Sequence, residues 1–280
     1  MVSVDNVYKS YGRKKVLNGA NLQIKQGEIV GIVGANGAGK TTLIKLISKL
    51  IYPTKGEIEL NDHSVAALVE QPAFFLDLTG RENLEYFLDK KVTTEVIENA
   101  PFGCEEFINL SVRKYSMGMR QKLALWMVFL AESDYILLDE PSVSLDINAV
   151  EELDKLLVEK KKDRGILIAS HNFSELQQVC DRVVVLKEGI CQDEIKLEVD
   201  NKDAYVIKIL NSHDKKIIDV LKKEKIIVTD GVIEFRGTEK EVALFMKKLI
   251  QLGVGVCEVF KKHAFLQLQY EKIIGEKSKL

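Results

Sequence analysis

Several features are missing from this sequence of 280 residues, and each absence excludes a class of protein. No apolar run approaches the roughly 20 residues that cross a bilayer as a helix. The richest apolar stretches, residues 28–33 and 123–131, are short or interrupted. The first residues, MVSVDNVYKSYGRKK, lack the apolar core of about 7 to 15 residues that a secretory signal peptide needs. We therefore expect a cytoplasmic chain whose role at any membrane depends on a partner.

Neither an excess of one charge nor a cysteine framework is present. The 40 Lys and Arg residues nearly balance the 42 Asp and Glu residues, so the net charge of -2 gives no sign of a basic surface for nucleic acid. The four cysteines show no CxxC spacing, and the four histidines form no pattern with them. Neither a disulfide framework nor a zinc site is therefore expected, and a reducing compartment fits best.

What the sequence does contain is an alternation of short apolar runs with longer helical patterns between about residues 27 and 195. Continuous apolar runs are typical of strands that are buried on both faces of a parallel sheet. Four runs have this character: residues 28–33, 135–138, 165–169 and 182–186. The first 25 residues instead alternate apolar and polar side chains, which predicts a small antiparallel sheet with one solvated face. The fold class is therefore α/β, with helices covering a mostly parallel sheet.

Two further segments extend this plan. Between residues 79 and 120 the pattern becomes helical, with Leu84, Phe87 and Leu88 at i, i+3 and i+4, which predicts a helical insertion. From residue 203 onward the predicted order is strand, helix, strand, strand, helix, strand, which is the ferredoxin-like α+β arrangement. The expected strands are 204–210, 225–228, 232–236 and 254–260, and the expected helices are 213–223 and 239–252. The charged stretch 198–203 reads as a connection, which predicts domains at 1–200 and 201–280.

A phosphate-binding loop is predicted at residues 34–42, GANGAGKTT, which match GxxxxGK[ST] between an apolar strand and an apolar helix. Glycines let the backbone wrap a phosphate closely, and the N–H groups at the helix N-terminus attract its charge. Lys40 is expected to reach the β- and γ-phosphates, and Thr41 to coordinate Mg²⁺. The residues expected to bind nucleotide here are Gly34, Asn36, Gly37, Ala38, Gly39, Lys40, Thr41 and Thr42.

Two carboxylates follow the apolar run YILL, about a hundred residues after Lys40. Ligands bind at the carboxyl ends of the strands in an open α/β sheet, so acids at this place face the substrate. Asp139 suits the Mg²⁺ shell, and Glu140 suits a general base that polarises the attacking water. Alone, an Asp-Glu pair after a strand is usually a solvated strand end. Together with the phosphate-binding loop, however, the pair is better explained as part of a catalytic site.

Further short motifs occur in a fixed order, and with them the chain resembles the ABC ATPase family over nearly all of residues 1 to 195. Taken singly, each motif residue has an ordinary structural explanation, such as packing or a surface hydrogen bond. Their order along the chain carries the resemblance. The motif residues are Tyr11, Lys40, Gln71, Ser116, Glu140, Asp146 and His171.

The resemblance implies a role for each of these residues. Tyr11 would stack on the adenine of ATP, with Val16 lining the same pocket. Gln71, in VEQP, would contact Mg²⁺ and the attacking water and would also sense a membrane partner. His171, at the end of the run GILIAS, would touch the γ-phosphate and orient Glu140.

The segment YSMGMRQ, residues 115–121, is similar to the family's signature motif and precedes a helix expected at residues 122–131. It departs from the common LSGGQ form because Met117 and Met119 replace a glycine and the glutamine. Ser116 and Gly118 remain, and the resemblance implies that they contact the γ-phosphate. This form of the motif is similar to that of bacitracin- and lantibiotic-type peptide exporters.

The resemblance implies an ATP- and Mg²⁺-dependent ATPase that powers a separate transmembrane permease, on the inner face of the membrane. The signature of one copy would close on ATP held by another, which implies a homodimer or a heterodimer linked across Asp146. A groove near Gln71 and residues 76–85 would receive a short helix of the permease. Export of a peptide or drug is favoured, and residues 201–280 are expected to serve dimerisation or regulation.

Other readings remain open. A soluble ABC-class ATPase acting on a ribosome or a nucleic-acid complex usually carries two nucleotide sets in one chain or long coiled-coil insertions, and neither pattern occurs here. A non-hydrolysing scaffold is disfavoured by Lys40, Asp139, Glu140 and His171. A generic P-loop kinase would not need the signature, the SLD motif (Ser144, Leu145 and Asp146) or His171.

Overall fold

The computed structural model describes residues 1–70, 72–197, 204–210, 221, 226–228, 231–237, 239–262, 266, 270 and 273–274. The chain divides into two compact units, Met1–Leu197 and Glu198–Leu280. No helix in the part of the chain that the structure describes has the length and apolar character to cross a membrane.

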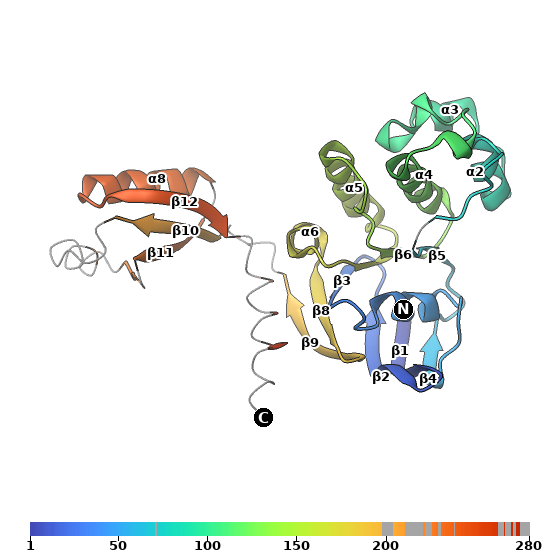
Figure 1. Ribbon diagram of the computed structural model, residues 1–280, viewed down its shortest axis with the longest axis horizontal. Coiled ribbons are helices and arrows are strands. Elements are labelled where there is room, and N and C mark those ends of the chain that lie inside the picture. The colour runs from blue at the N-terminus through green and yellow to red at the C-terminus, as the bar shows by residue number, and fades with distance from the viewer. Residues whose placement is uncertain are drawn as a thin grey trace. The chain divides into compact units, whose positions relative to one another are not determined.

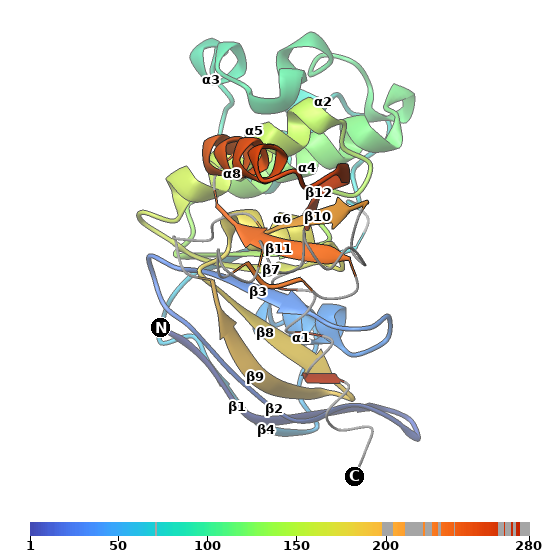
Figure 2. The ribbon, with the colours of Figure 1, turned by 90° about the vertical axis from the view of Figure 1, so that its left-hand side faces the viewer.

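A six-stranded sheet forms the centre of the first unit (Figures 1 and 2). All neighbouring pairs are parallel except β8 and β9. In spatial order the strands are β5 (Val65–Leu68), β6 (Tyr135–Asp139), β7 (Gly165–Ala169), β3 (Ile29–Val33), β8 (Arg182–Lys187) and β9 (Ile190–Lys196). Every residue of β3, β6 and β7 is buried. This burial on both faces explains their continuous apolar sequences and confirms the strands predicted from them.

A three-stranded antiparallel sheet packs beside it, in the order β2 (Lys14–Ile24), β1 (Val2–Tyr11), β4 (Lys55–Glu59). Its inward side chains, among them Val4 and Leu22, join the main core through α1 (Lys40–Ile47). The amphipathic pattern therefore set which face of this small sheet is solvated, as predicted from the first 25 residues.

Three chain segments leave the main sheet at one edge. β7 lies between β3 and β6, and the register pairs Ala169 with both Ile32 and Asp139. Because these strands are parallel, the loop after β3 and the residues after β6 and β7 emerge side by side. Helix α5 (Ile147–Lys160) follows β6, and helix α6 (Phe173–Val179) follows β7.

The predicted helical insertion is real but interrupted. It contains α2 (Gly80–Leu88), α3 (Thr94–Glu98), the short 3-10 helices η1 (Pro101–Glu106) and η2 (Val112–Lys114), and α4 (Met117–Leu130). Positive φ at Phe102 and Gly103 breaks the helical path. On α2, Leu84 is fully buried whereas Phe87 is 45% exposed, so the apolar spacing marks the core only in part.

The helix after the signature begins earlier than predicted, at Met117 rather than at residue 122. Ser116 is the cause, because its hydroxyl accepts a hydrogen bond from the Met119 N–H at 3.1 Å and so caps the helix. The signature residues after Ser116 thus form the first turn of α4, with their N–H groups at the helix N-terminus.

The second unit contains a three-stranded antiparallel sheet in the order β11 (Val232–Arg236), β10 (Ala204–Ile209), β12 (Val256–Lys262). Helix α8 (Glu239–Gln251) packs on it, with the rings of Phe235 and Phe245 stacked at 4.4 Å.

The structure contradicts one of the elements predicted for this unit and does not describe most of another. The strand expected at 225–228 is wrong for its described part, because residues 226–228 belong to no strand. The helix expected at 213–223 lies outside the described residues except for Leu221, which is helical and buried.

Candidate functional site

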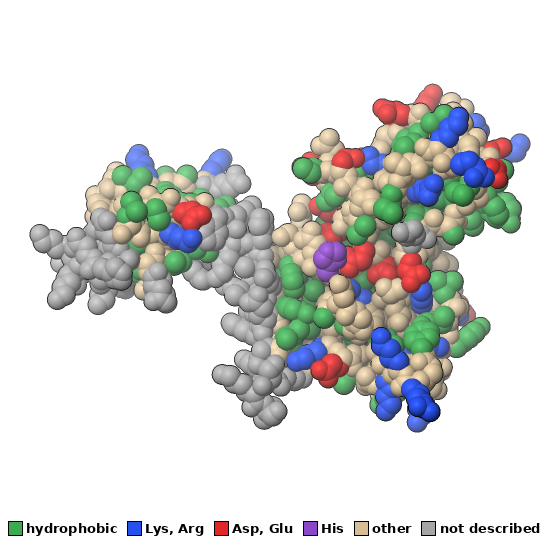
Figure 3. All heavy atoms as spheres, in the orientation of Figure 1, with side chains coloured by type: hydrophobic (Ala, Val, Ile, Leu, Met, Phe, Trp, Pro, Cys, Tyr) green, Lys and Arg blue, Asp and Glu red, His purple; other side chains and the backbone are tan. Residues whose placement is uncertain are grey.

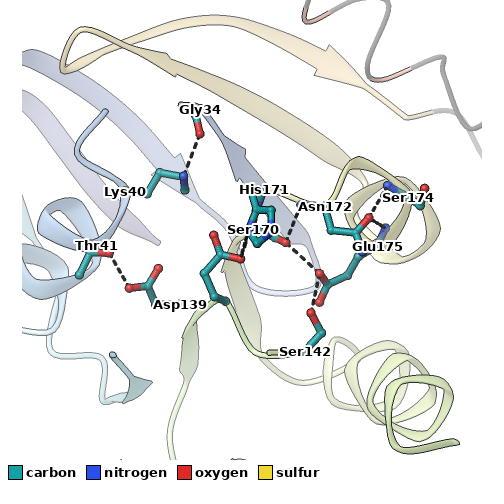
Figure 4. Close-up of polar contacts among 11 residues, drawn as sticks. Gly34, Lys40, Thr41, Asp139, Ser142, Ser170, His171, Asn172, Ser174 and Glu175 are labelled. Atoms are coloured by element: carbon teal, nitrogen blue, oxygen red, sulfur yellow. Dashed lines mark hydrogen bonds and ion pairs between the residues drawn. The ribbon is translucent and has the colours of Figure 1, made fainter. Parts of the chain in front are cut away.

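The phosphate-binding loop lies between β3 and α1 and has the backbone that its glycines allow. Gly39 has a φ of 112°, and a Cβ on Gly34 would lie 2.3 Å from the Leu186 carbonyl oxygen. No side chain caps α1, so its first N–H groups face the loop. The Lys40 ammonium is buried and donates to the Gly34 carbonyl oxygen at 2.8 Å (Figure 4). The loop therefore concentrates N–H dipoles and one ammonium group, which suits a phosphate chain.

Thr41 and Asp139 meet beside this loop. The Thr41 hydroxyl donates to Asp139 Oδ2 at 2.6 Å, although 98 residues separate the two in sequence. Asp139 is 7% exposed, and its Oδ1 has no hydrogen-bond partner among the described residues. Burial raises the pKa of Asp139, against the effect of the Thr41 hydrogen bond. A buried carboxylate oxygen without a partner next to a hydroxyl is the donor set of a hard cation such as Mg²⁺.

No group of three or more His, Cys, Asp or Glu side chains suited to a metal occurs in the part of the chain that the structure describes. Mg²⁺ in phosphoryl-transfer sites takes one or two protein carboxylates and completes its shell from phosphates and water. Thr41 and Asp139 thus fit such an ion, while Gln71, the third expected ligand, lies outside the described residues.

A cavity of about 460 Å³ extends from this loop to the end of β1. Tyr11 and Val16 line it, as do Asn36 of the loop, Thr42 of α1 and Asp139 at the end of β6. Tyr11 is 48% exposed, with the Lys9 ammonium 5.3 Å from its ring centroid. The cavity therefore joins an accessible aromatic ring to the phosphate-binding loop, which are the two kinds of surface that a nucleotide contacts.

Lys14 also lines this cavity and was missed in the sequence. It pairs with Tyr11 across the β1–β2 hairpin. The signal was the run Arg13-Lys14-Lys15 just after Tyr11, which is indistinguishable from a solvated hairpin tip without the strand register.

Glu140 and His171 are brought together from the ends of β6 and β7. The Glu140 N–H donates to the Ala169 carbonyl oxygen at 2.8 Å, and Glu140 has a positive φ of 50°. This turn directs the carboxylate toward His171, whose Nδ1 lies 2.7 Å from Glu140 Oε2. The glutamate side chain is 27% exposed and the histidine 67% exposed. Acidic side chains gather beside a histidine at the centre of the face in Figure 3.

Ser116 and Gly118 lie elsewhere. They line a second cavity of about 1050 Å³ together with residues of the SLD motif, and none of its lining residues belongs to the cavity of the phosphate-binding loop. Within one copy, Ser116 and Gly118 therefore do not line the cavity of the phosphate-binding loop.

The start of α4 is attached to the segment that follows Glu140. The Gln121 side chain donates to the Pro141 carbonyl oxygen at 2.8 Å, and the Lys122 ammonium lies 2.6 Å from Asp146 Oδ2. Hydrogen bonds from Lys122 and from the Ala149 N–H lower the pKa of Asp146. Gln121 and Lys122 were not expected as site residues, because nothing in their sequence distinguishes them from ordinary helix polar residues.

A smaller cavity of about 270 Å³ lies between these elements. Glu70 and Pro72, which flank Gln71, line it with Asp139 and Glu140. Arg120 of α4 also lines it. The residues on either side of Gln71 therefore lie beside the two carboxylates that sequence analysis assigned to the ion and to water activation.

This chain is similar to known proteins in both sequence and structure. The family model described as "ABC transporter" matches residues 17–143. The bacitracin transport ATP-binding protein BcrA of Bacillus licheniformis is 28% identical over 98% of this chain and 97% of its own length. The capsule polysaccharide export ATP-binding protein CtrD of Neisseria meningitidis is 36% identical over 68% of this chain and 91% of its own length. The dimeric ATP-binding cassette MJ0796, in a post-hydrolysis state with ADP and Pi, matches with a TM-score of 0.63 and 26% identity, covering 71% of this chain and 99% of that one.

Proposed function

Because the chain belongs to the ATP-binding proteins of ABC transporters and is an ABC ATPase, we propose that it powers export of a peptide or drug through a separate permease. The permease would hold the ATPase at the cytoplasmic face of the membrane. The observation that carries the ATPase part is the convergence of Lys40, Thr41 and Asp139 with the Glu140–His171 pair at one edge of the sheet.

In this proposal ATP lies in the 460 Å³ cavity, with adenine on Tyr11 and Val16 and the phosphates in the loop at residues 34–42. Lys40 leaves the Gly34 carbonyl and binds the β- and γ-phosphates. Thr41 and Asp139 would hold Mg²⁺, with Gln71 as a further ligand. The ion would neutralise charge on the phosphates during transfer.

Glu140 acts as the general base in hydrolysis. Its carboxylate accepts a proton from the water that attacks the γ-phosphate, and the P–O bond to ADP breaks. His171 is 2.7 Å from the same carboxylate, which fixes the direction of Glu140, and its exposed edge is free to touch the γ-phosphate. A general base of this kind contributes about 10²- to 10⁴-fold to the rate.

The active form would be a dimer in which Ser116 and Gly118 of one copy close on ATP bound by the other. Two observations support this: the signature lines a cavity of its own, and its N–H groups start the 14-residue helix α4. The relative MJ0796 is dimeric. Hydrolysis would remove the γ-phosphate that joins the two copies, and the dimer would open.

The permease would dock on an exposed aromatic cluster that follows Gln71. Phe74, Phe75, Tyr86 and Phe87 form it, with ring centroids of neighbouring pairs 4.8 to 6.3 Å apart. Tyr86 is 64% exposed, and buried Asn83 fixes the cluster by bonding both the N–H and the carbonyl oxygen of Phe75. Exposed apolar patches of this kind mark interaction sites, and a short amphipathic helix of the permease fits the chemistry. The four rings flank, at both ends, the segment 76–85 near which the groove was expected together with Gln71.

Peptide or drug export is preferred over polysaccharide export because of the second unit. BcrA matches 98% of this chain, whereas CtrD matches 68% despite its higher identity. We further propose that residues 201–280 form a domain for dimerisation or regulation whose three described strands follow the ferredoxin-like order, although residues 226–228 form no strand. The described sheet order β11-β10-β12, with α8 on one face, supports this arrangement.

The test is purification of a tagged Glu140→Gln protein from native membranes in detergent with ATP, followed by mass spectrometry. We expect one stoichiometric membrane protein with several spans. Recovery of ribosomal or nucleic-acid partners instead would contradict the proposal and support a soluble ABC-class ATPase.

A further inference from the structure

Glu175 is a buried acidic residue that the proposed hydrolysis does not use. It lies in the first turn of α6 and is 6% exposed. Two serine hydroxyls donate to its Oε2: Ser142 at 2.9 Å and Ser170 at 2.8 Å (Figure 4). One carboxylate oxygen therefore joins the segment after β6 to the segment after β7.

The two serines have defined places relative to the catalytic pair. Ser142 follows Glu140 by two residues, and Ser170 directly precedes His171. The Glu140–His171 contact of 2.7 Å spans the same two segments. We infer that Glu175 is a positioning residue that holds these segments together through Ser142 and Ser170 and so sets the geometry of Glu140 and His171.

The local sequence alone would give Glu175 a different task. Asn172 caps α6, and a Glu three residues after a cap normally bonds back to the N–H of the capping residue. Here the Asn172 N–H donates instead to Ser170 Oγ, at 3.0 Å. The Ser170 hydroxyl thus accepts from Asn172 and donates to Glu175, and the glutamate is released from capping to reach Ser142.

The electrostatics agree with a role for the bonded oxygen. Burial raises the pKa of Glu175, the hydrogen bonds from Ser170 and Ser142 lower it, and the charges of Glu140 and His171 act in opposite directions. Oε1 is buried and has no partner among the residues that the structure describes. A buried carboxyl with one unused oxygen costs stability relative to an apolar side chain. The contribution of Glu175 to the fold therefore lies in its two hydrogen bonds with Ser142 and Ser170.

The inference rests on the proposed roles of Glu140 and His171. Its test uses the full chain and compares Glu175→Met, which removes both acceptors at similar size, with Glu175→Gln, whose amide oxygen can accept both hydroxyls. We expect Glu175→Met to lower kcat for ATP hydrolysis by about tenfold or more with KM within about twofold, because small displacements of catalytic groups are costly whereas the ATP cavity is unchanged. Glu175→Gln should retain kcat within about threefold, since both hydrogen bonds persist.

Ser142→Ala with Ser170→Ala provides a second measurement. If the serines are the route, adding Glu175→Met to this double variant lowers kcat no further. Circular dichroism and thermal melting show which variants are folded. A folded Glu175→Met with unchanged kcat, an equal loss in Glu175→Gln, or fully additive losses would each overturn the inference.

Glu140→Gln and His171→Ala are assayed in parallel. If these two abolish hydrolysis and a folded Glu175→Met keeps an unchanged kcat, the inference fails and the proposed function stands. If Glu140→Gln hydrolyses ATP at the normal rate, the assignment of the base fails whatever Glu175 does.

Discussion

Gly118 and Ser144 approach so closely that a Cβ on Gly118 would lie 2.7 Å from the Ser144 carbonyl oxygen. Ser144 has a φ of 68°, which is uncommon for a residue other than glycine. The first turn of the signature helix therefore rests directly on the SLD motif of the same copy. Gly118 has a packing role besides the phosphate contact that the family resemblance implies.

Gly118→Ala is expected to push these segments apart. The cost in the free energy of unfolding should be about 1–3 kcal/mol, as for other overpacked sites. We expect ATPase activity to fall by about tenfold or more because Ser116 is displaced, while the affinity of one copy for ATP stays the same. Steady-state ATPase assays and titration with a fluorescent ATP analogue measure the two effects. Normal activity in the variant would show that the SLD motif can shift to accommodate the added methyl group without affecting ATP hydrolysis.

Glu140→Gln is expected to lower ATP hydrolysis by about 10²- to 10⁴-fold, because the amide cannot accept the proton of the attacking water. ATP should then hold two copies together, and size-exclusion chromatography with ATP and Mg²⁺ should show a dimer. Glu132→Gln is the matched control, since that side chain is 89% exposed and pairs only at the surface with Lys90. Hydrolysis at the normal rate in the Glu140 variant would refute the base assignment.

Lys14→Ala is expected to raise KM for ATP by roughly three- to tenfold with little change in kcat, because removing uniform binding affects KM alone. The neighbouring Lys15→Ala tests whether position matters rather than charge, since Lys15 is exposed and does not line the cavity. Equal effects of the two variants on KM would mean that Lys14 attracts ATP only through its charge and makes no contact with it.

The aromatic cluster predicts a separation of ATP binding from permease binding. Phe75→Ser with Tyr86→Ser should abolish co-purification of the membrane partner, while the cavity at residues 34–42 keeps its affinity for ATP. Tyr52→Ser is the control, because Tyr52 is 78% exposed and lies outside the cluster. Full recovery of the partner by the double variant would place the docking surface elsewhere.

Asp154 predicts a pH dependence of stability. Burial, followed by the charges of Glu175 and Glu151, raises the pKa of Asp154 to about 6. A carboxyl whose folded pKa is raised binds its proton more tightly in the folded chain, so the cost of burying its charge is absent well below its unfolded pKa of about 3.8. The cost develops as the pH rises from about 4 to 6 and stays constant above that.

Asp154→Asn should therefore stabilise the chain at pH 8 by roughly 1–2 kcal/mol, because solvent partly screens the charge of Asp154 and keeps the effect below the full pKa shift. The gain should vanish near pH 4. Urea unfolding of both proteins across this range gives the difference at each pH. Glu159→Gln on the same helix, where the side chain is 61% exposed, should show no such trend. A constant difference between wild type and Asp154→Asn would contradict the shifted pKa.

The sequence by itself determined the main strands and the phosphate-binding loop. Strands buried on both faces require continuous apolar runs, and β3, β6, β7 and β8 carry them. The loop at residues 34–42 is determined locally, because glycines and a following helix are enough to build it. The order of motifs indicated the ABC family before any contact was known.

Only the tertiary structure decided which side chains meet. Glu140 and His171 lie 31 residues apart, and their contact depends on the parallel register of β6 and β7. Glu175 has the local sequence of a helix cap, and Lys14 that of a solvated turn. Their surroundings are made by strands and helices distant in sequence, and neither periodicity nor propensity reports such distances. Local physics thus fixed the elements, and packing fixed their chemistry.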